Sequence, residues 1–288
     1  MFKRSIVKYI KRSMHVKPIK MRWETGGVNY SYLVSTQDKK QSWLIDPAEP
    51  EEVWPALGEE EKSSILAIVN THHHYDHAGG NTQLLMNLRE KVPNDKLAII
   101  GGSEECPHVS EIPDHMQKYK LESLQVTCIR TPCHTQDSVC YYIRDPETNE
   151  QAIFTGDTLF TAGCGRFFEG TGEEMDKALN KYILQCVGEA NWATTKVYPG
   201  HEYTLSNVKF VRSKIFKEVG QCPRFDELEK YSQHHEVTTG QFTIADDLQF
   251  NPFMMIDNPI VRKAVGDPEG KMHRAVVMDK LRKMKNAM

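Results

Sequence analysis

The sequence predicts an α/β domain followed by a helical region. Short apolar segments of strand length recur between turns from about residue 24 to about residue 203. Beyond about residue 204 the strand signals fade and helical spacing remains. Polar, chemistry-bearing residues directly follow several apolar segments, which is where open α/β sheets place their sites. The 288 residues, 39% hydrophobic and 26% charged, suit one large or two ordinary globular domains.

The first 23 residues differ from the rest of the chain because they contain eight Lys or Arg and no acid. Phe2, Ile6 and Ile10 recur every four residues, with basic residues on the other faces. A basic, amphipathic, acid-free start is typical of a mitochondrial transit peptide, so we predict a segment outside the fold and a mitochondrial matrix location. The alternatives are a disordered basic tail, or translation from Met14 or Met21 to give a cytoplasmic form.

Charge and hydropathy argue against several classes of partner. The net charge of -3, with excess Lys and Arg only at the termini, does not predict a nucleic-acid surface. No apolar run approaches the roughly 18 residues of a membrane span, so we expect no membrane insertion. The seven cysteines are odd in number and form no CxxC, which predicts reduced thiols. We expect a monomer.

The α/β region begins with a predicted hairpin. Residues 30–36 (YSYLVST) and 42–49 (SWLIDPAE) alternate apolar with polar residues and flank a polar turn. Residues 63–71 (SSILAIVNT) form a nearly continuous apolar run, as in a strand buried on both faces. Helical spacing over residues 82–92 predicts a helix, and residues 96–102 (KLAIIGG) predict another buried strand.

The remaining elements continue this pattern. Thr171 and Glu174 form a capping box that predicts a helix over the following residues, MDKALNKYILQCVG. Further strands are expected within residues 124–134, 138–145, 152–160 and 195–203, and helices within residues 205–220 and 273–288. These expectations divide the chain into a transit-like segment, an α/β domain and a helical domain, at residues 1–23, 24–203 and 204–288.

The stretch NTHHHYDHAGGN, residues 70–81, contains four of the 12 histidines. Residues two apart in an extended loop point the same way, so His72 and His74 can face one metal ion. Asp76 and His77 can turn toward a second ion nearby. Imidazole and carboxylate ligands suit zinc, iron or manganese. A solvated, histidine-rich turn is the alternative interpretation.

Three single residues follow other predicted strands: His134 in TPCHT, Asp157 in FTGDTLF and His201 in YPGHEY. Each alone could be a surface, capping or turn residue. Together they place polar groups at the ends of core strands. Five histidines and two aspartates suffice for two ions that share one carboxylate and a bridging water. We interpret His73 as a packing or supporting residue and not as a ligand.

These motifs resemble the metallo-β-lactamase superfamily and, more closely, the glyoxalase II family of hydroxyacylglutathione hydrolases. The resemblance rests on THHHYDHAGGN, TPCHT, FTGDTLF, GCGRFFEGT and GHEYT, which occur in the family's order. It implies an αββα sandwich with a dinuclear metal centre at one edge and a helical domain that helps bind glutathione. Asp76 and Asp157 would orient the bridging hydroxide. The implied ligands are His72, His74 and His134 for the first ion, Asp76, His77 and His201 for the second, and Asp157 as the bridge.

The glutathione contacts that the resemblance implies are matched less fully. Tyr203 fits the family tyrosine, whereas Arg166 stands where many relatives have lysine and Phe168 where many have tyrosine. The loss of that tyrosine hydroxyl removes one expected contact to the peptide. At the C-terminus, Arg282 and Lys285 fit the family's basic pair. If the family's basic pair is placed farther upstream without a gap, it falls on Val277 and Lys280 instead. The non-functional alternative is a solvated basic face of the helix.

The implied activity is hydrolysis of S-(2-hydroxyacyl)glutathione, typically S-D-lactoylglutathione, to glutathione and D-lactate, the second step of methylglyoxal detoxification. Two cations, zinc or alternatively iron or manganese, would lower the pKa of a shared water from about 15.7 toward about 7. A thiolate can depart without a strong general acid, since its conjugate acid has a pKa of about 8.5. The rivals are a one-iron persulfide dioxygenase, a metal-dependent nuclease and a non-catalytic binding module.

Overall fold

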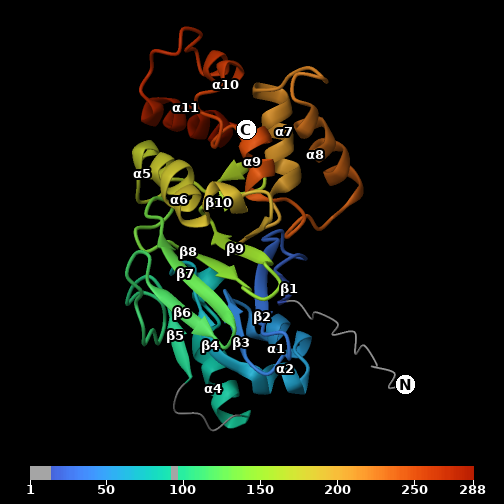
Figure 1. Ribbon diagram of the computed structural model, residues 1–288, viewed down its shortest axis with the longest axis vertical. Coiled ribbons are helices and arrows are strands. Elements are labelled where there is room, and N and C mark those ends of the chain that lie inside the picture. The colour runs from blue at the N-terminus through green and yellow to red at the C-terminus, as the bar shows by residue number, and fades with distance from the viewer. Residues whose placement is uncertain (1–13, 92–96) are drawn as a thin grey trace, which may run out of the picture.

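A computed structural model describes residues 14–91 and 97–288, in which two five-stranded sheets form the centre of the α/β region (Figure 1). The first sheet has the order β1-β2-β3-β4-β5, with β1 His15–Met21, β2 Asn29–Ser35, β3 Ser42–Ile45, β4 Ile65–Val69 and β5 Ala98–Ile100. The second has the order β12-β9-β8-β7-β6, with β6 Lys118–Leu121, β7 Leu124–Arg130, β8 Val139–Arg144, β9 Gln151–Gly156 and β12 Thr195–Pro199. A short hairpin, β10 Leu159–Phe160 and β11 Gly163–Cys164, follows β9.

Strand directions bring several carboxyl ends to one edge of the sandwich. In the first sheet, β2 and β3 form the predicted antiparallel hairpin, and β4 runs parallel to both β3 and β5. In the second sheet, β12 runs parallel to β9, so the loops after these two strands emerge side by side. Because β4 is central, it is almost entirely buried, as its continuous apolar run predicts.

The sheets pack face to face between two helical layers. Large aromatic side chains fill the space between the sheets, including Tyr30, Tyr141 and Phe154. The outer face of the first sheet packs against α1 Pro50–Ala56, α2 Glu59–Ser64 and α4 Asn81–Lys91. The outer face of the second sheet packs against α5 Gly172–Lys177, η1 Ala178–Ile183 and α6 Leu184–Val187, and η2 Glu189–Asn191 leads into β12. The αββα prediction is therefore confirmed, and Thr171 and Glu174 form the predicted capping box.

The C-terminal helices gather at the end of the molecule opposite α1, α2 and α4 (Figure 1). They are α7 Thr204–Lys214, α8 Pro223–His234, α9 Ile244–Phe250, α10 Pro259–Ala264 and α11 Arg274–Asn286. They share one hydrophobic cluster with the second sheet, and α11 lies along α5, where the Asp279 carboxylate accepts from the Gly172 N–H at 2.9 Å. Among the described residues, no helix has the length and apolar character needed to cross a membrane.

The N-terminal segment requires a correction. The sequence predicts residues 1–23 outside the fold, and residues 1–13, with their amphipathic pattern, lie outside the described part of the chain. The second half of the segment instead forms β1, the edge strand paired antiparallel with β2. Ile19 and Met21 are buried, while lysines of the same strand make ion pairs with Glu61 and Glu236. The many basic residues of this segment made a strand difficult to predict. The acids that pair with its lysines lie far along the chain, so no local pattern reveals them.

Candidate metal centre

The candidate site lies at the sheet edge where β4, β9 and β12 end. The loop after β4 leads into a single helical turn, α3 Tyr75–Ala78, which turns Asp76 and His77 inward. Parallel pairing places the residues that follow β9 and β12 side by side. The structure brings all seven predicted ligand positions together: His72, His74, Asp76 and His77 from the β4 loop, His134 from the β7–β8 loop, Asp157 after β9 and His201 after β12.

Three histidines form the first group. The Nδ1 atom of His74 lies 3.1 Å from the Nε2 atom of His72 and 3.1 Å from the Nε2 atom of His134. All three donor atoms lie within 4.8 Å of one another. His72 and His134 are buried, and His74 lines the adjoining cavity. This spacing allows one cation to bind all three nitrogens.

A second group forms beside the first. Its members are Asp76, His77 and His201, whose donor atoms also lie within 4.8 Å of one another. The Nε2 atoms of His77 and His201 are 3.3 Å apart, and Asp76 Oδ2 is 3.5 Å from the same His201 nitrogen. Asp157 lies between the groups: Oδ1 is 3.3 Å from His77 Nε2, and Oδ2 is 3.5 Å from His134 Nε2 and from His201 Nε2. Its carboxylate can therefore contact ions in both groups.

Most of the candidate ligand histidines are held through the nitrogen that faces away from the centre. Backbone carbonyls accept from two of them, so those Nδ1 atoms must carry the proton and leave Nε2 free. His74 Nδ1 lies 3.1 Å from Nε2 of both His72 and His134, and one ring hydrogen cannot satisfy both contacts fully, whereas a cation can bind all three nitrogens, so the donor set fits divalent metal ions. The outer contacts are His134 to Arg166 O at 3.0 Å, His201 to Gly27 O at 2.8 Å, His77 to Asp46 Oδ2 at 2.9 Å and His72 to Thr71 Oγ1 at 3.1 Å.

The electrostatics of the centre favour neutral imidazoles in the first group and attract positive charge to the second group. Burial lowers the pKa of His72, His74 and His134, so their imidazoles are neutral at neutral pH. Burial disfavours the Asp157 carboxylate, but His201 and His77 outweigh it and hold the Asp157 pKa well below its usual value. Burial also opposes protonation of His77, yet the carboxylates of Asp157 and Asp46 raise the His77 pKa. The two carboxylates thus attract positive charge to the position of the second group.

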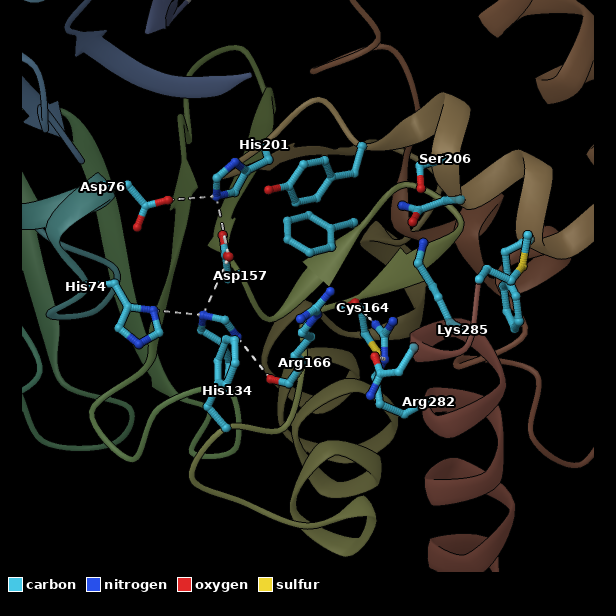
Figure 2. A pocket seen from close by; sticks show the side chains of 18 of the residues that line it. His74, Asp76, His134, Asp157, Cys164, Arg166, His201, Ser206, Arg282 and Lys285 are labelled. Carbon is cyan, nitrogen blue, oxygen red and sulfur yellow. Dashed lines mark hydrogen bonds and ion pairs between the residues drawn. The ribbon is translucent and has the colours of Figure 1, made fainter. Parts of the chain in front are cut away.

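A cavity of about 990 Å³ opens from these groups toward the C-terminal helices (Figure 2). His74, Asp76, His134, Asp157 and His201 line one end of it. The other end is formed by the β10–β11 hairpin with α7 and α11, and Arg166, Arg282 and Lys285 converge there in Figure 2. The five predicted substrate contacts all line this cavity: Arg166, Phe168, Tyr203, Arg282 and Lys285.

The C-terminal basic pair sits deep in this cavity. Arg282 Nη1 donates to the Cys164 carbonyl at 2.7 Å, so part of its guanidinium is used to hold the hairpin. The Lys285 ammonium is buried and has no hydrogen-bond partner among residues 14–91 and 97–288, and burial lowers its pKa to about 7. The alternative pair points elsewhere, since Val277 is buried in the core and Lys280 donates to the Val265 carbonyl at 3.0 Å.

Two aromatic rings adjoin the end of the cavity that the histidine and aspartate groups line, which we call the metal end; the opposite end is the helical end. The Tyr203 ring stacks on His201 with centroids 4.5 Å apart and an interplanar angle of 8°. Phe168 is 61% exposed and presents its ring to His134 and His74 at centroid distances of 5.2 and 5.7 Å. A ligand bound at the metal end would therefore contact apolar surface on both sides.

The sequence analysis missed several supporting residues. Asp46 accepts from the Thr71 N–H and hydroxyl and from His77, and so holds the start of the histidine-rich loop. An acid directly after an apolar strand was a usable signal, because it is the same pattern that marks Asp157. Asn29 contacts Asp76 and His201, and no sequence signal distinguishes it from an ordinary strand-start asparagine. His73 binds Asp137 at 2.9 Å and lies in none of the donor groups.

Comparison with known proteins places the chain among related sequences. Residues 25–91 match the model described as metallo-beta-lactamase superfamily, and residues 202–288 match hydroxyacylglutathione hydrolase C-terminus. A Saccharomyces cerevisiae protein named hydroxyacylglutathione hydrolase, mitochondrial, is 63% identical over 277 residues, 96% of this chain and 97% of the relative. The cytoplasmic isozyme of the same yeast is 62% identical over 275 residues, 96% of this chain and 100% of the relative.

Solved structures share the fold. ETHE1 from Myxococcus xanthus superposes with a TM-score of 0.58 at 21% identity, covering 95% of this chain and 99% of that one. A metallo-beta-lactamase from Staphylococcus aureus has a TM-score of 0.58 at 18% identity, covering 94% of this chain and 72% of that one. At these identities the likeness establishes the fold alone.

Proposed function

Because the chain belongs to the hydroxyacylglutathione hydrolase family, we propose that it hydrolyses S-(2-hydroxyacyl)glutathione, typified by S-D-lactoylglutathione, to glutathione and a 2-hydroxy acid. One observation carries the proposal. A single cavity joins a two-group histidine and aspartate cluster to three cationic side chains, Arg166, Arg282 and Lys285. Its metal end suits hydrolysis of a thioester carbonyl, and its cationic end suits a peptide with two carboxylates.

We propose that two divalent ions occupy the cluster, zinc with iron or manganese as alternatives. His72, His74 and His134 would hold one ion, Asp76, His77 and His201 the other, and Asp157 would bridge them. When bound, such ions lower the pKa of water and polarise a carbonyl oxygen. Within the chain, the Asp76 and Asp157 carboxylates face this space and can accept the hydrogens of an attacking water, which orients its lone pair.

At the other end, the Lys285 ammonium and the Arg166 and Arg282 guanidiniums are available to the carboxylates of glutathione. A carboxylate would satisfy the buried Lys285 group, which otherwise lacks a partner in the described part of the chain. Phe168 and Tyr203 would cover the thioester and limit access of bulk water. The thiolate leaving group needs no strong acid, which agrees with the predominance of carboxylate and neutral imidazole groups at the metal end.

The test is turnover of S-D-lactoylglutathione by metal-loaded and metal-free protein, with ions counted per chain. We expect turnover only in the loaded protein and two ions per chain. His134→Ala should abolish turnover with the fold retained, whereas His234→Ala, which changes an exposed histidine on α8, should leave it unchanged. Absence of turnover in the loaded protein contradicts the proposal. A single iron per chain would favour the dioxygenase instead, and turnover by His134→Ala would exclude the proposed ligand role.

For location, we propose the mitochondrial matrix, with the cytoplasm as the alternative. The basic, acid-free composition of the first 23 residues supports import. One relative is named mitochondrial and another, of nearly equal identity, is named cytoplasmic, so sequence identity does not distinguish the two locations. A chain started at Met14 keeps β1, whereas a start at Met21 removes it. Fractionation of tagged full-length and Met14-start chains tests this, and equal cytoplasmic location of both forms would count against import.

A further inference from the structure

The turn between β1 and β2 reaches the second donor group. Asn29, the first residue of β2, is completely buried. Its side-chain amide nitrogen lies 3.0 Å from the Asp76 backbone carbonyl and 3.1 Å from Asp76 Oδ2. The same nitrogen lies 3.3 Å from His201 Nε2, and the backbones of the two residues form an isolated antiparallel bridge. One amide group therefore contacts two of the three members of the second group.

The same turn holds His201 from its other side. The Gly27 carbonyl accepts from His201 Nδ1 at 2.8 Å, which directs Nε2 inward. A Cβ atom at Gly27 would lie 2.7 Å from Asn29 Oδ1 and 2.8 Å from Arg22 Cβ, so the close approach requires glycine. Backbone bonds from Tyr30 N to Gly200 O and from Glu202 N to Val28 O, both 2.9 Å, fix the turn against the His201 loop.

We propose that Asn29 is a positioning residue for the second metal ion, an inference that rests on the two-ion centre proposed above. The amide donates an N–H to Asp76 Oδ2, the carboxylate oxygen that lies 3.5 Å from His201 Nε2, and so fixes the plane of that carboxylate. Its second hydrogen holds the Asp76 backbone at the start of α3. In the described structure the Asn29 amide donates to Asp76, contacts His201 Nε2 at 3.3 Å and bonds with no member of the first group.

This arrangement predicts an effect confined to one of the two ions. Outer partners that orient metal ligands typically change metal affinity by roughly 10- to 100-fold when they are removed. Asn29→Ala should therefore weaken the second ion by about 10- to 100-fold and leave the first ion unchanged. Asn180→Ala is a matched control, because the Asn180 amide likewise donates to a carboxylate, Asp176 at 2.8 Å, and to a carbonyl, Phe253 at 3.1 Å, but in the helical region.

The experiment is stepwise Zn²⁺ titration of metal-free full-length protein against a chromophoric chelator, with thermal melts of each metal-free variant. The expected result is two steps in wild type and in Asn180→Ala, and a selectively weakened second step in Asn29→Ala. Two unchanged steps, or equal weakening of both, would overturn the inference. If Asn29→Ala does not fold, Asn29→Ser is used with the same expectation, because its shorter side chain does not span the distance to Asp76. Fewer than two steps in wild type would instead contradict the proposed two-ion centre.

Discussion

The two ends of the cavity treat their nitrogen groups in opposite ways. At the metal end, outward-facing histidine nitrogens bond to carbonyls or carboxylates, and the buried Asn29 supports Asp76 and His201. At the helical end, the Lys285 ammonium is buried without a partner in the described part of the chain, whereas buried oxygens without a partner occur at both ends (Asn207 Oδ1, Asp157 Oδ1 and Asn29 Oδ1). Metal ligands must keep their geometry before the ions arrive, whereas substrate contacts must stay unpaired until the substrate binds.

This difference has an energetic consequence. A buried ammonium without a partner destabilises the folded protein, and proteins tolerate such groups where function requires them. At the metal end each charged group lies beside a group of opposite charge, so the ligands are held in place without a buried, unpaired cation. The comparison predicts that variants at the metal end lower turnover and ion content, whereas variants at the helical end change KM and can increase stability.

The largest expected effect is at the carboxylate shared by both groups. Asp157→Ala should reduce kcat by at least about 10³-fold, because loss of about 4 kcal/mol of charge stabilisation corresponds to that factor. Ion content should fall with it, since Asp157 contacts members of both groups. Steady-state kinetics and metal analysis measure the two effects. Normal turnover and two bound ions in Asp157→Ala would contradict the proposed bridging role of Asp157.

The contact between α9 and the β10–β11 hairpin predicts a pH-dependent change of up to about 4 kcal/mol in the free energy of unfolding. Asp247 on α9 accepts from the Ala162 N–H at 2.9 Å, and burial raises its pKa to about 7. Between about pH 4 and 7 the folded protein retains a proton that the unfolded chain has lost, so this contribution falls as pH rises and is constant above about pH 7. Asp247→Asn should lack this fall. Urea unfolding of both metal-free proteins at pH 5 and 8 measures the difference, and identical pH dependence would contradict the assignment.

At the helical end, Lys285→Met should raise KM by about 10- to 100-fold with little change in kcat, since a charge-assisted hydrogen bond contributes about 1.5 to 3 kcal/mol. Burial lowers the Lys285 pKa to about 7, so as pH falls from about 10.5 to about 7 the unfolded chain gains a proton that the folded protein lacks, and this destabilisation is complete below about pH 7. The variant should therefore have a higher Tm at pH 7 than wild type. A kcat loss with unchanged KM would place Lys285 in the chemical step instead.

The smallest effect is expected at the exposed aromatic ring over the metal end. Phe168→Tyr adds the hydroxyl that the family resemblance leads us to expect at this position, and it should lower KM by about two- to tenfold, the value of one hydrogen bond of about 0.5 to 1.5 kcal/mol. Phe168 is 61% exposed, so the hydroxyl can be accommodated without repacking. An unchanged KM would show that glutathione does not reach this ring.

The sequence alone determined features that depend on neighbours along the chain. The alternation over residues 30–36 and 42–49 predicted a hairpin, which β2 and β3 form, and the apolar run over residues 63–71 predicted the buried β4. Thr171 and Glu174 predicted a helix start because a capping box is formed by residues three apart. The histidine-rich loop was recognisable for the same reason, since its donor spacing is local.

Only the tertiary structure decided which distant residues complete and support the centre. β1 is stabilised by pairing with β2 and by acids far along the chain, so its basic sequence alone predicted a segment outside the fold. Asn29 lies 47 positions from Asp76 and 172 from His201, yet parallel and antiparallel pairing brings them into hydrogen-bond distance. Local spacing encodes backbone conformation, whereas the position of a supporting amide depends on how two sheets pack, and no short segment contains that information.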